Sequence, residues 1–129
     1  MSVHPNQFTK EVIGAAIEIH RALGPGLLES AYQHCLAREL DVRGIPFQRE
    51  VWVGIDYKGI IIERAYRLDF LVGGLVVVEL KAVDCLTPID DAQLLTYLRL
   101  GGWPVGLLIN FNVPILKEGI RRRVLNLAE

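Results

Sequence analysis

Three charged residues near the middle of the chain combine side-chain types that could do chemistry together. Glu79 and Lys81 lie two residues apart in the stretch LVVVELKAV (75–83), and Asp69 precedes them. The apolar β-formers that begin this stretch predict a buried strand. Alternate side chains of a strand point to the same face, so Glu79 and Lys81 share one face. Because buried charges are costly without partners, the pair requires an explanation.

Two carboxylates and a lysine held close together suit the hydrolysis of a phosphodiester bond. Neighbouring carboxylates repel and raise each other's pKa, and a bound divalent cation removes that conflict. Hard oxygen ligands favour Mg²⁺ or Mn²⁺, with Asp69 and Glu79 as metal ligands. The amine of Lys81 would lie beside the attacking water or a phosphate oxygen and stabilise negative charge there. The set therefore predicts metal-assisted phosphodiester hydrolysis.

A Glu-x-Lys tripeptide by itself has a simpler interpretation. Charges are common where a strand leaves the core, and Glu79 and Lys81 would then form a solvated ion pair at the strand end. On the tripeptide alone this alternative stays open. Asp69 and two further polar sites favour the chemical interpretation.

The first of these sites is a third carboxylate, Glu29, in the stretch GPGLLESAY. A carboxylate in the first turn of a helix is favoured by the helix dipole, which is reason enough for its presence. Alternatively, its helix places Glu29 beside Asp69 and Glu79, where it completes or supports the set of metal ligands. Tyr32 follows at i+3, shares the same helical face, and is expected to help position the substrate.

The second site is the pair Gln93 and Tyr97 in the stretch QLLTY. Residues at i and i+4 share one helical face, and apolar packing gives no reason for two hydrogen-bonding groups there. The pair is either a satisfied polar contact at a helix surface or a helix face that positions a nucleic-acid backbone and supports the metal ligands. The pattern itself leaves both interpretations open.

Helical periodicity predicts two helices at the start of the chain. Apolar residues recur at steps of three and four over residues 6–23, and the sequence Gly-Pro-Gly then ends that helix. A second helix is predicted over residues 27–44, with Gly44 as its C-terminal cap.

The next three segments have the alternating pattern of strands and form an antiparallel meander. They cover residues 47–57, 60–72 and 75–81. A two-residue loop at Gly73-Gly74 would put Asp69 and Glu79 out of register, so that they could not share a face. We therefore predict a three-residue loop or a bulge there, made possible by a left-handed glycine.

The last elements are a helix, a strand and a short helix. Thr87 and Pro88 suit the start of a helix that extends to about residue 100. Residues 104–110 predict a buried strand, and a short helix is expected from residue 115. The predicted fold class is α/β, in the sense of an α+β mixed sheet covered by helices, in the order α-α-β-β-β-α-β-α and within one domain, residues 1–129.

Composition excludes several classes of protein. The chain has 129 residues, 51% of them hydrophobic, and a net charge of −1, so it is not a basic non-specific nucleic-acid binder. It has no apolar run of about 18 residues that could span a membrane, and its first residues do not resemble a signal peptide. The spacing of His4, His20 and His34 argues against zinc. Cys35 and Cys85 suit buried thiols, so we expect a cytoplasmic protein.

The ordered set of motifs resembles the GxxExxY family, a branch of the PD-(D/E)xK nuclease superfamily. The motifs are Gly26-x-x-Glu29-x-x-Tyr32, Asp69, Glu79-x-Lys81 and Gln93-x-x-x-Tyr97. The resemblance extends from about residue 11 to residue 123. Each motif is weak alone, whereas their order is specific.

The resemblance implies a restriction-endonuclease-like core and a role for each matching position. Asp69 and Glu79 would be metal ligands, and Lys81 would be the catalytic lysine. Glu29 would be a helix-borne acid of the site and a further metal ligand. Gln93 and Tyr97 resemble the QxxxY motif of the recombination-exonuclease branch, whose helix supports the active site and touches DNA. Leu68 stands where many members of the superfamily have proline before the aspartate.

Two hypotheses follow from the residues and the resemblance together. The first is a Mg²⁺-dependent (or Mn²⁺-dependent) nuclease, with DNA rather than RNA as substrate. The alternative is a catalytically silent nuclease-fold protein that binds nucleic acid or assembles with a partner. A chain of this size has little surface with which to grip a duplex, so a homodimer or an unknown protein partner is expected. Arg64, Arg67, Arg99 and residues 121–123 would supply a basic surface or simply a solvated rim.

Overall fold

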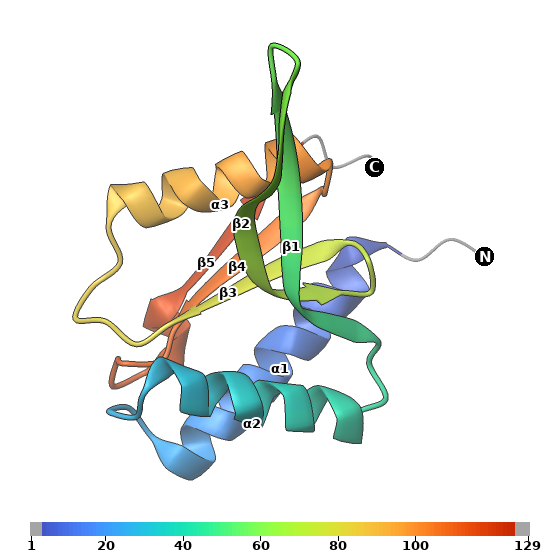
Figure 1. Cartoon of the computed structure of the whole chain (residues 1–129). Helices are drawn as coiled ribbons and strands as arrows, with labels where there is room; N and C mark the ends of the chain where they lie inside the picture. Colours follow the sequence, from blue (N-terminus) through green and yellow to red (C-terminus); the bar gives the residue numbers. More distant parts are fainter. Residues whose placement is uncertain (1–3, 126–129) are drawn as a thin grey trace.

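The structure, a computed structural model, describes residues 4–125. Figure 1 shows the elements in chain order. They are α1 (Pro5–Leu23), α2 (Glu29–Val42), β1 (Phe47–Tyr57), β2 (Ile60–Val72), β3 (Val76–Lys81), α3 (Pro88–Gly101), β4 (Val105–Asn110), the 3₁₀ helix η1 (Leu116–Gly119) and β5 (Ile120–Val124). The predicted mixed α/β class is confirmed. Within the described residues, no helix is both long and apolar enough to cross a membrane.

The five strands form one mixed sheet in the order β1-β2-β3-β4-β5. The pairs β1–β2, β2–β3 and β4–β5 are antiparallel. The pair β3–β4 is parallel, and α3 makes the crossover between these two strands. The three predicted N-terminal strands therefore form the expected meander, with β3 at the centre of the sheet.

Helices cover both faces of the sheet (Figure 1). On the face covered by α1 and α2, Val78 and Leu80 of β3 pack against residues such as Ala16 and Leu36. On the opposite face, Val77 of β3 packs with the α3 and β4 side chains. Because side chains alternate along β3, Glu79 and Lys81 lie on the α3 side, in line with Val77.

The helix boundaries follow local signals, with differences at both ends of α2, which ends at Val42 before its C-cap residue Arg43. Pro5 begins α1, and Gly24, at φ 73°, ends it. The helix α2 begins at Glu29 instead of residue 27, because the preceding Leu28 is still extended, with φ −68° and ψ 150°. In α3, Thr87 precedes Pro88, and Gly102 ends the helix in a left-handed conformation.

The loop between β2 and β3 confirms the predicted register. Val72 pairs with Val76, so three residues form the loop, and Gly73 and Gly74 have φ values of 61° and 69°. A Cβ atom at Gly73 would collide with the ring of Phe8, which makes this glycine doubly necessary. The same register continues toward Asp69 and Glu79 and brings them level with each other.

The prediction for the C-terminal segment was wrong. In place of a short helix, the chain forms only η1 and then β5, which pairs with β4 from Ile109–Ile120 to Val105–Val124. The physical reason is tertiary, because β4 would otherwise expose an unpaired edge of the sheet. The last part of the predicted helix, residues 126–129, lies outside the described residues.

Candidate active site

The site lies where β2 and β3 separate. Their described ladder ends at the pair Phe70 and Val78, and the next residues are Asp69 and Glu79. The Glu79 Oε2 atom accepts a hydrogen bond of 2.8 Å from the backbone N–H of Asp69. In return, Asp69 Oδ2 accepts one of 2.9 Å from the N–H of Leu80. Each carboxylate thus binds the backbone of the other strand, so both side chains are held rigidly by the sheet.

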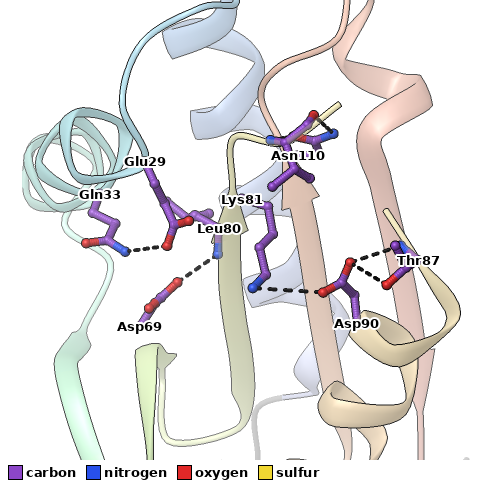
Figure 2. A network of polar contacts seen from close by, with 9 residues as sticks. Glu29, Gln33, Asp69, Leu80, Lys81, Thr87, Asp90 and Asn110 are labelled. Carbon is purple, nitrogen blue, oxygen red and sulfur yellow. Dashed lines mark hydrogen bonds and ion pairs between the residues drawn. The ribbon is translucent and has the colours of Figure 1, made fainter. Parts of the chain in front are cut away.

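A pocket of about 160 Å³ opens at this point and gathers side chains from both helical layers. Figure 2 shows part of it, with Glu29 next to Gln33, Asp69 directed at the backbone of Leu80, and the amine of Lys81 turned toward Asp90. Its lining residues are Glu29, Arg67, Asp69, Glu79, Lys81, Asp90, Gln93, Leu94, Tyr97 and Leu108. All but one of the predicted site residues therefore meet in a single pocket.

Glu79 is the most buried acid of the pocket, with only 9% of its surface exposed. Burial is the main reason why its pKa is raised to about 9, and the nearby Asp69 carboxylate raises it further. The Asp69 N–H bond and the charge of Lys81 oppose this shift without cancelling it. Glu79 therefore keeps its proton at neutral pH while the pocket contains no cation.

The donor set of the pocket fits a hard divalent cation. One oxygen each of Asp69 and Glu79 accepts no backbone hydrogen bond within residues 4–125. Over the same residues, no three His, Cys, Asp or Glu side chains converge tightly enough to hold an ion by themselves. Mg²⁺ commonly takes only one or two carboxylates and completes its shell with water and substrate phosphates. Asp69 and Glu79 supply that minimal set, and a bound cation would compensate the charge that Glu79 carries once its proton has left.

Lys81 lies beside the two acids and has an unpredicted partner. Its Nζ atom is 3.9 Å from Asp90 Oδ1, in a partly exposed ion pair. Asp90 Oδ2 also accepts hydrogen bonds from the N–H and the Oγ1 of Thr87 at the start of α3. A Thr-x-x-Asp pattern at a helix start was the available signal for Asp90. Exposed ion pairs of this length are weak, so the Lys81 amine is free to turn toward a bound anion.

Glu29 reaches the pocket from the first turn of α2. Gln33 donates a hydrogen bond of 3.3 Å to its Oε1 atom, as Figure 2 shows. The pKa of Glu29 is raised, first by burial and then by the charge of Asp69, and Lys81 opposes the shift. These interactions link Glu29 electrostatically to the acids on the strands.

Tyr32 is the predicted site residue that the fold keeps out of the pocket. It is fully buried, and its ring stacks on Phe111 with centroids 4.3 Å apart. Its hydroxyl donates to the carbonyl of Gly24 at 2.6 Å and accepts from the N–H of Leu27 at 3.2 Å. The structure therefore does not bring Tyr32 to the pocket wall with the other predicted site residues. Tyr32 holds the turn that precedes α2 and so fixes where Glu29 enters the pocket.

Gln93 and Tyr97 both line the pocket from α3. The ring of Tyr97 stacks on Tyr66 of β2, with centroids 4.4 Å apart and an interplanar angle of 5°. Burial raises the pKa of Tyr97, and the carboxylates of Glu79 and Asp69 add to the shift. The pair is therefore a feature of the pocket and not an isolated surface contact of the helix.

Asn110 is a supporting residue that the sequence analysis did not single out. It ends β4 opposite Lys81 in the parallel ladder and is 2% exposed. Its Oδ1 accepts from the N–H of Val83 at 3.1 Å, and its Nδ2 donates to the carbonyl of Val83 at 2.9 Å. The two bonds hold the chain directly after Lys81. A polar residue at the end of the apolar stretch PVGLLIN was the signal that could have found it.

Comparison with known proteins gives one match. Residues 6–123 match the family described as the PD-(D/E)XK nuclease superfamily. No curated protein and no solved structure matches the chain. The chain therefore belongs to the PD-(D/E)XK nuclease superfamily, and its five-stranded mixed sheet with flanking helices is the restriction-endonuclease-like fold of that superfamily. Membership implies a nucleic-acid substrate and nuclease chemistry, for which divalent metals are the usual cofactors.

Proposed function

We propose that this chain is a divalent-metal-dependent nuclease that hydrolyses phosphodiester bonds of DNA, in the GxxExxY branch of its superfamily. The observation that carries the proposal is the reciprocal anchoring of Asp69 and Glu79 across two separating strands, with Lys81 on the same face of β3. Rigid strands hold such groups at fixed separation, as catalysis requires. Ordinary strand-end ion pairs do not need two acids tied to each other's backbone.

Asp69 and Glu79 would hold the metal, with Mg²⁺ or Mn²⁺ as the expected ion. When bound, the metal polarises the phosphate and makes water a better nucleophile. Glu29 would complete the ligand set, directly or through water. Because the pKa of Glu79 is raised to about 9, its proton would have to leave before the carboxylate could act as a ligand.

Lys81 would contribute a positive charge at the reacting phosphate. Within the described residues, its amine forms no ion pair with a carboxylate of β2 or β3. Its ion pair with Asp90 is long. Turning from Asp90 toward a phosphate oxygen would orient the scissile group and stabilise the charge that develops there. Asp90 would hold the amine in place until substrate arrives.

Gln93 and Tyr97 would position the substrate backbone from α3. Gln93 is exposed at the rim of the pocket, and Tyr97 lies deeper, against Tyr66. An amide and a phenol are both suitable donors to phosphate oxygens. DNA is preferred over RNA as the substrate because the Gln-x-x-x-Tyr pattern resembles that of DNA-degrading nucleases.

Cleavage assays with three conservative variants test the proposal. Asp69→Asn, Glu79→Gln and Lys81→Met should each reduce Mg²⁺-dependent cleavage of DNA by about a hundredfold or more, because each removes a charge that acts on the reacting phosphate. Glu18→Gln, an exposed acid on α1, is the matched control and should cleave at the wild-type rate. Cleavage that survives in all three variants would contradict the assignment, provided that circular dichroism shows the same fold.

A catalytically silent protein is the second candidate function. It is favoured by the absence of a complete three-ligand cluster among residues 4–125 and by the low net charge. Such a protein would act through nucleic-acid binding or assembly, as a homodimer or with a protein partner. Metal binding measured by calorimetry, without cleavage of any DNA or RNA substrate, would support this candidate against the first.

A further inference from the structure

An exposed tryptophan next to the pocket is flanked by two arginines. The Cζ atoms of Arg64 and Arg67 lie 5.3 Å and 5.6 Å from the ring centroid of Trp52. Trp52 nevertheless keeps 47% of its surface exposed. We call these three residues the Trp52 platform. A large aromatic side chain left open between two cations combines a stacking surface with positive charge.

A distortion of the hairpin builds this platform. Trp52 of β1 pairs directly with Arg67 of β2, but the register shifts between Val53 and Ile55. Gly54 therefore faces residues 63–65 by itself, and a Cβ atom there would lie 2.9 Å from the carbonyl oxygen of Ile62. In a regular strand, residues 64 and 67 would point to opposite faces. The bulge turns Arg64 to the face that carries Trp52 and Arg67.

The platform is continuous with the active site. Arg67 lines the pocket together with Asp69, which follows it by two residues on β2. From there, β1 and β2 run outward as a hairpin that projects beyond the sheet, as Figure 1 shows. A polymer bound in the pocket therefore passes over Arg67 and Trp52 if it follows this hairpin.

The charges of the platform favour a polyanion with exposed aromatic groups. Among the ion pairs within the described residues, none involves Arg64 or Arg67, so their charges are not neutralised by a protein carboxylate there. A DNA duplex offers phosphates but keeps its base faces stacked inside. An unpaired strand offers both phosphates and open base faces, which stack on aromatic side chains.

We propose that the Trp52 platform binds an unpaired DNA strand next to the active site. A base stacks on the indole, and Arg64 and Arg67 contact the phosphates on either side of it. The inference rests on the proposed function for its choice of nucleic acid as the partner. It adds the substrate class, which is single-stranded DNA or the single-stranded part of a DNA end.

Tryptophan fluorescence gives a direct test of stacking. The chain has two tryptophans, and the Trp103→Phe variant leaves Trp52 as the only reporter. Titration with a short oligo(dT) in the presence of a chelator should quench the emission, since stacked bases quench indole. A blunt duplex of equal phosphate content should quench it much less. No quenching by oligo(dT), or equal quenching by the duplex, would overturn the proposal.

Binding measurements on variants provide the second test. Trp52→Ala should weaken oligo(dT) binding by about tenfold, or about 1.4 kcal/mol, through loss of one base stack, and Trp52→Phe should restore most of the affinity. A plot of log affinity against log salt concentration has a negative slope, and Arg64→Ala should make that slope shallower by about one. Ile61→Ala is the matched control, since Ile61 is 71% exposed on the same hairpin without a flanking arginine. Equal loss in the control and in Trp52→Ala would overturn the proposal.

These tests separate the platform from the nuclease assignment. They contain no metal and need no turnover, so quenching and a Trp52-dependent affinity would support the platform even if cleavage is never detected. If DNA is cleaved but Trp52→Ala binds and cleaves single strands as well as Ile61→Ala does, the platform fails and the nuclease stands. A change of oligomeric state in Trp52→Ala, seen by light scattering without any loss of DNA affinity, would identify a contact between copies instead and would also overturn it.

Discussion

At the scale of single residues, Glu79 combines burial, charge and rigidity. Its carboxyl group lies at the end of a core strand, accepts the N–H of Asp69, and has its pKa raised to about 9, mainly by burial. An acid in this state is costly when ionised and has a high affinity for any cation that can compensate it. The cost to stability of burying Glu79 is therefore evidence that this residue has a role other than packing.

The raised pKa predicts how stability depends on pH. Glu79 holds its proton more tightly in the folded protein than in the unfolded chain. Its contribution to the free energy of unfolding is therefore fully present below the unfolded pKa of 4.5 and is lost as pH rises toward about 9. Glu79→Gln should thus stabilise the metal-free protein by about 1–3 kcal/mol near pH 8 and have little effect near pH 4. Denaturant unfolding of both proteins at several pH values measures this difference. A difference that does not vary with pH would contradict the predicted cause.

At the scale of elements, the chain after β3 is held by the end of β4. Asn110 bonds both backbone groups of Val83, and the N–H of Phe111 donates to the carbonyl of Lys81 at 3.0 Å. The parallel pair β3–β4 therefore sets the direction in which Lys81 points. The turn before α2, held by Tyr32, performs the same task for Glu29.

Asn110→Ala should impair the site although Asn110 does not line the pocket. Loss of the buried amide leaves the N–H and carbonyl of Val83 without these bonds, which should cost about 1–3 kcal/mol of stability. Cleavage should fall mainly through kcat, because Lys81 loses its position while substrate binding elsewhere persists. Asn112→Ala is the control, since Asn112 is half-buried and its hydrogen bond to the carbonyl of Val83 is longer, at 3.4 Å. Unfolding curves and steady-state kinetics of both variants test this, and equal effects would argue against a positioning role for Asn110.

At the scale of the whole molecule, the site exists only where two helical layers meet through a gap in the sheet. The strands β2 and β3 separate beyond Phe70 and Val78, so that Glu29 of α2 and Gln93 of α3 line one pocket from opposite faces. With a net charge of −1, the protein lacks the general attraction that a basic protein has for DNA. Under the proposed function, binding of substrate would therefore depend on the pocket, a bound metal and the Trp52 platform.

Metal binding should stabilise the fold as a whole. Because the ion would join groups from two strands, Mg²⁺ or Mn²⁺ at a hundredfold excess over Kd should stabilise the wild type by about 2–3 kcal/mol. Removal with a chelator should reverse the gain, and the Asp69→Ala, Glu79→Ala double mutant should show none. Thermal unfolding with and without each ion measures the effect. An equal gain in the double mutant would locate the binding elsewhere.

The sequence by itself determined the elements whose signals are local. Periodicities of 3.6 and 2 indicated the helices and the meander, and the glycines after β2 permitted the three-residue loop or bulge that convergence of the two acids required. That loop, together with strand alternation, was sufficient to place Asp69, Glu79 and Lys81 in one pocket. Helical position and spacing singled out Glu29, Gln93 and Tyr97, the resemblance to known motifs favoured a role for them in the site, and the fold brings them to the same pocket.

Only the tertiary structure decided which polar groups face the pocket and which support it. Tyr32 shares the helical face predicted for it, yet its ring is buried against Phe111 and two backbone groups hydrogen-bond to its hydroxyl. The arginine-rich end of the chain becomes β5 because an unpaired edge of β4 is available. Asp90, Asn110 and the Trp52 platform depend on contacts between distant segments. Such contacts leave no periodic pattern, since they are set by how packed elements approach each other in space.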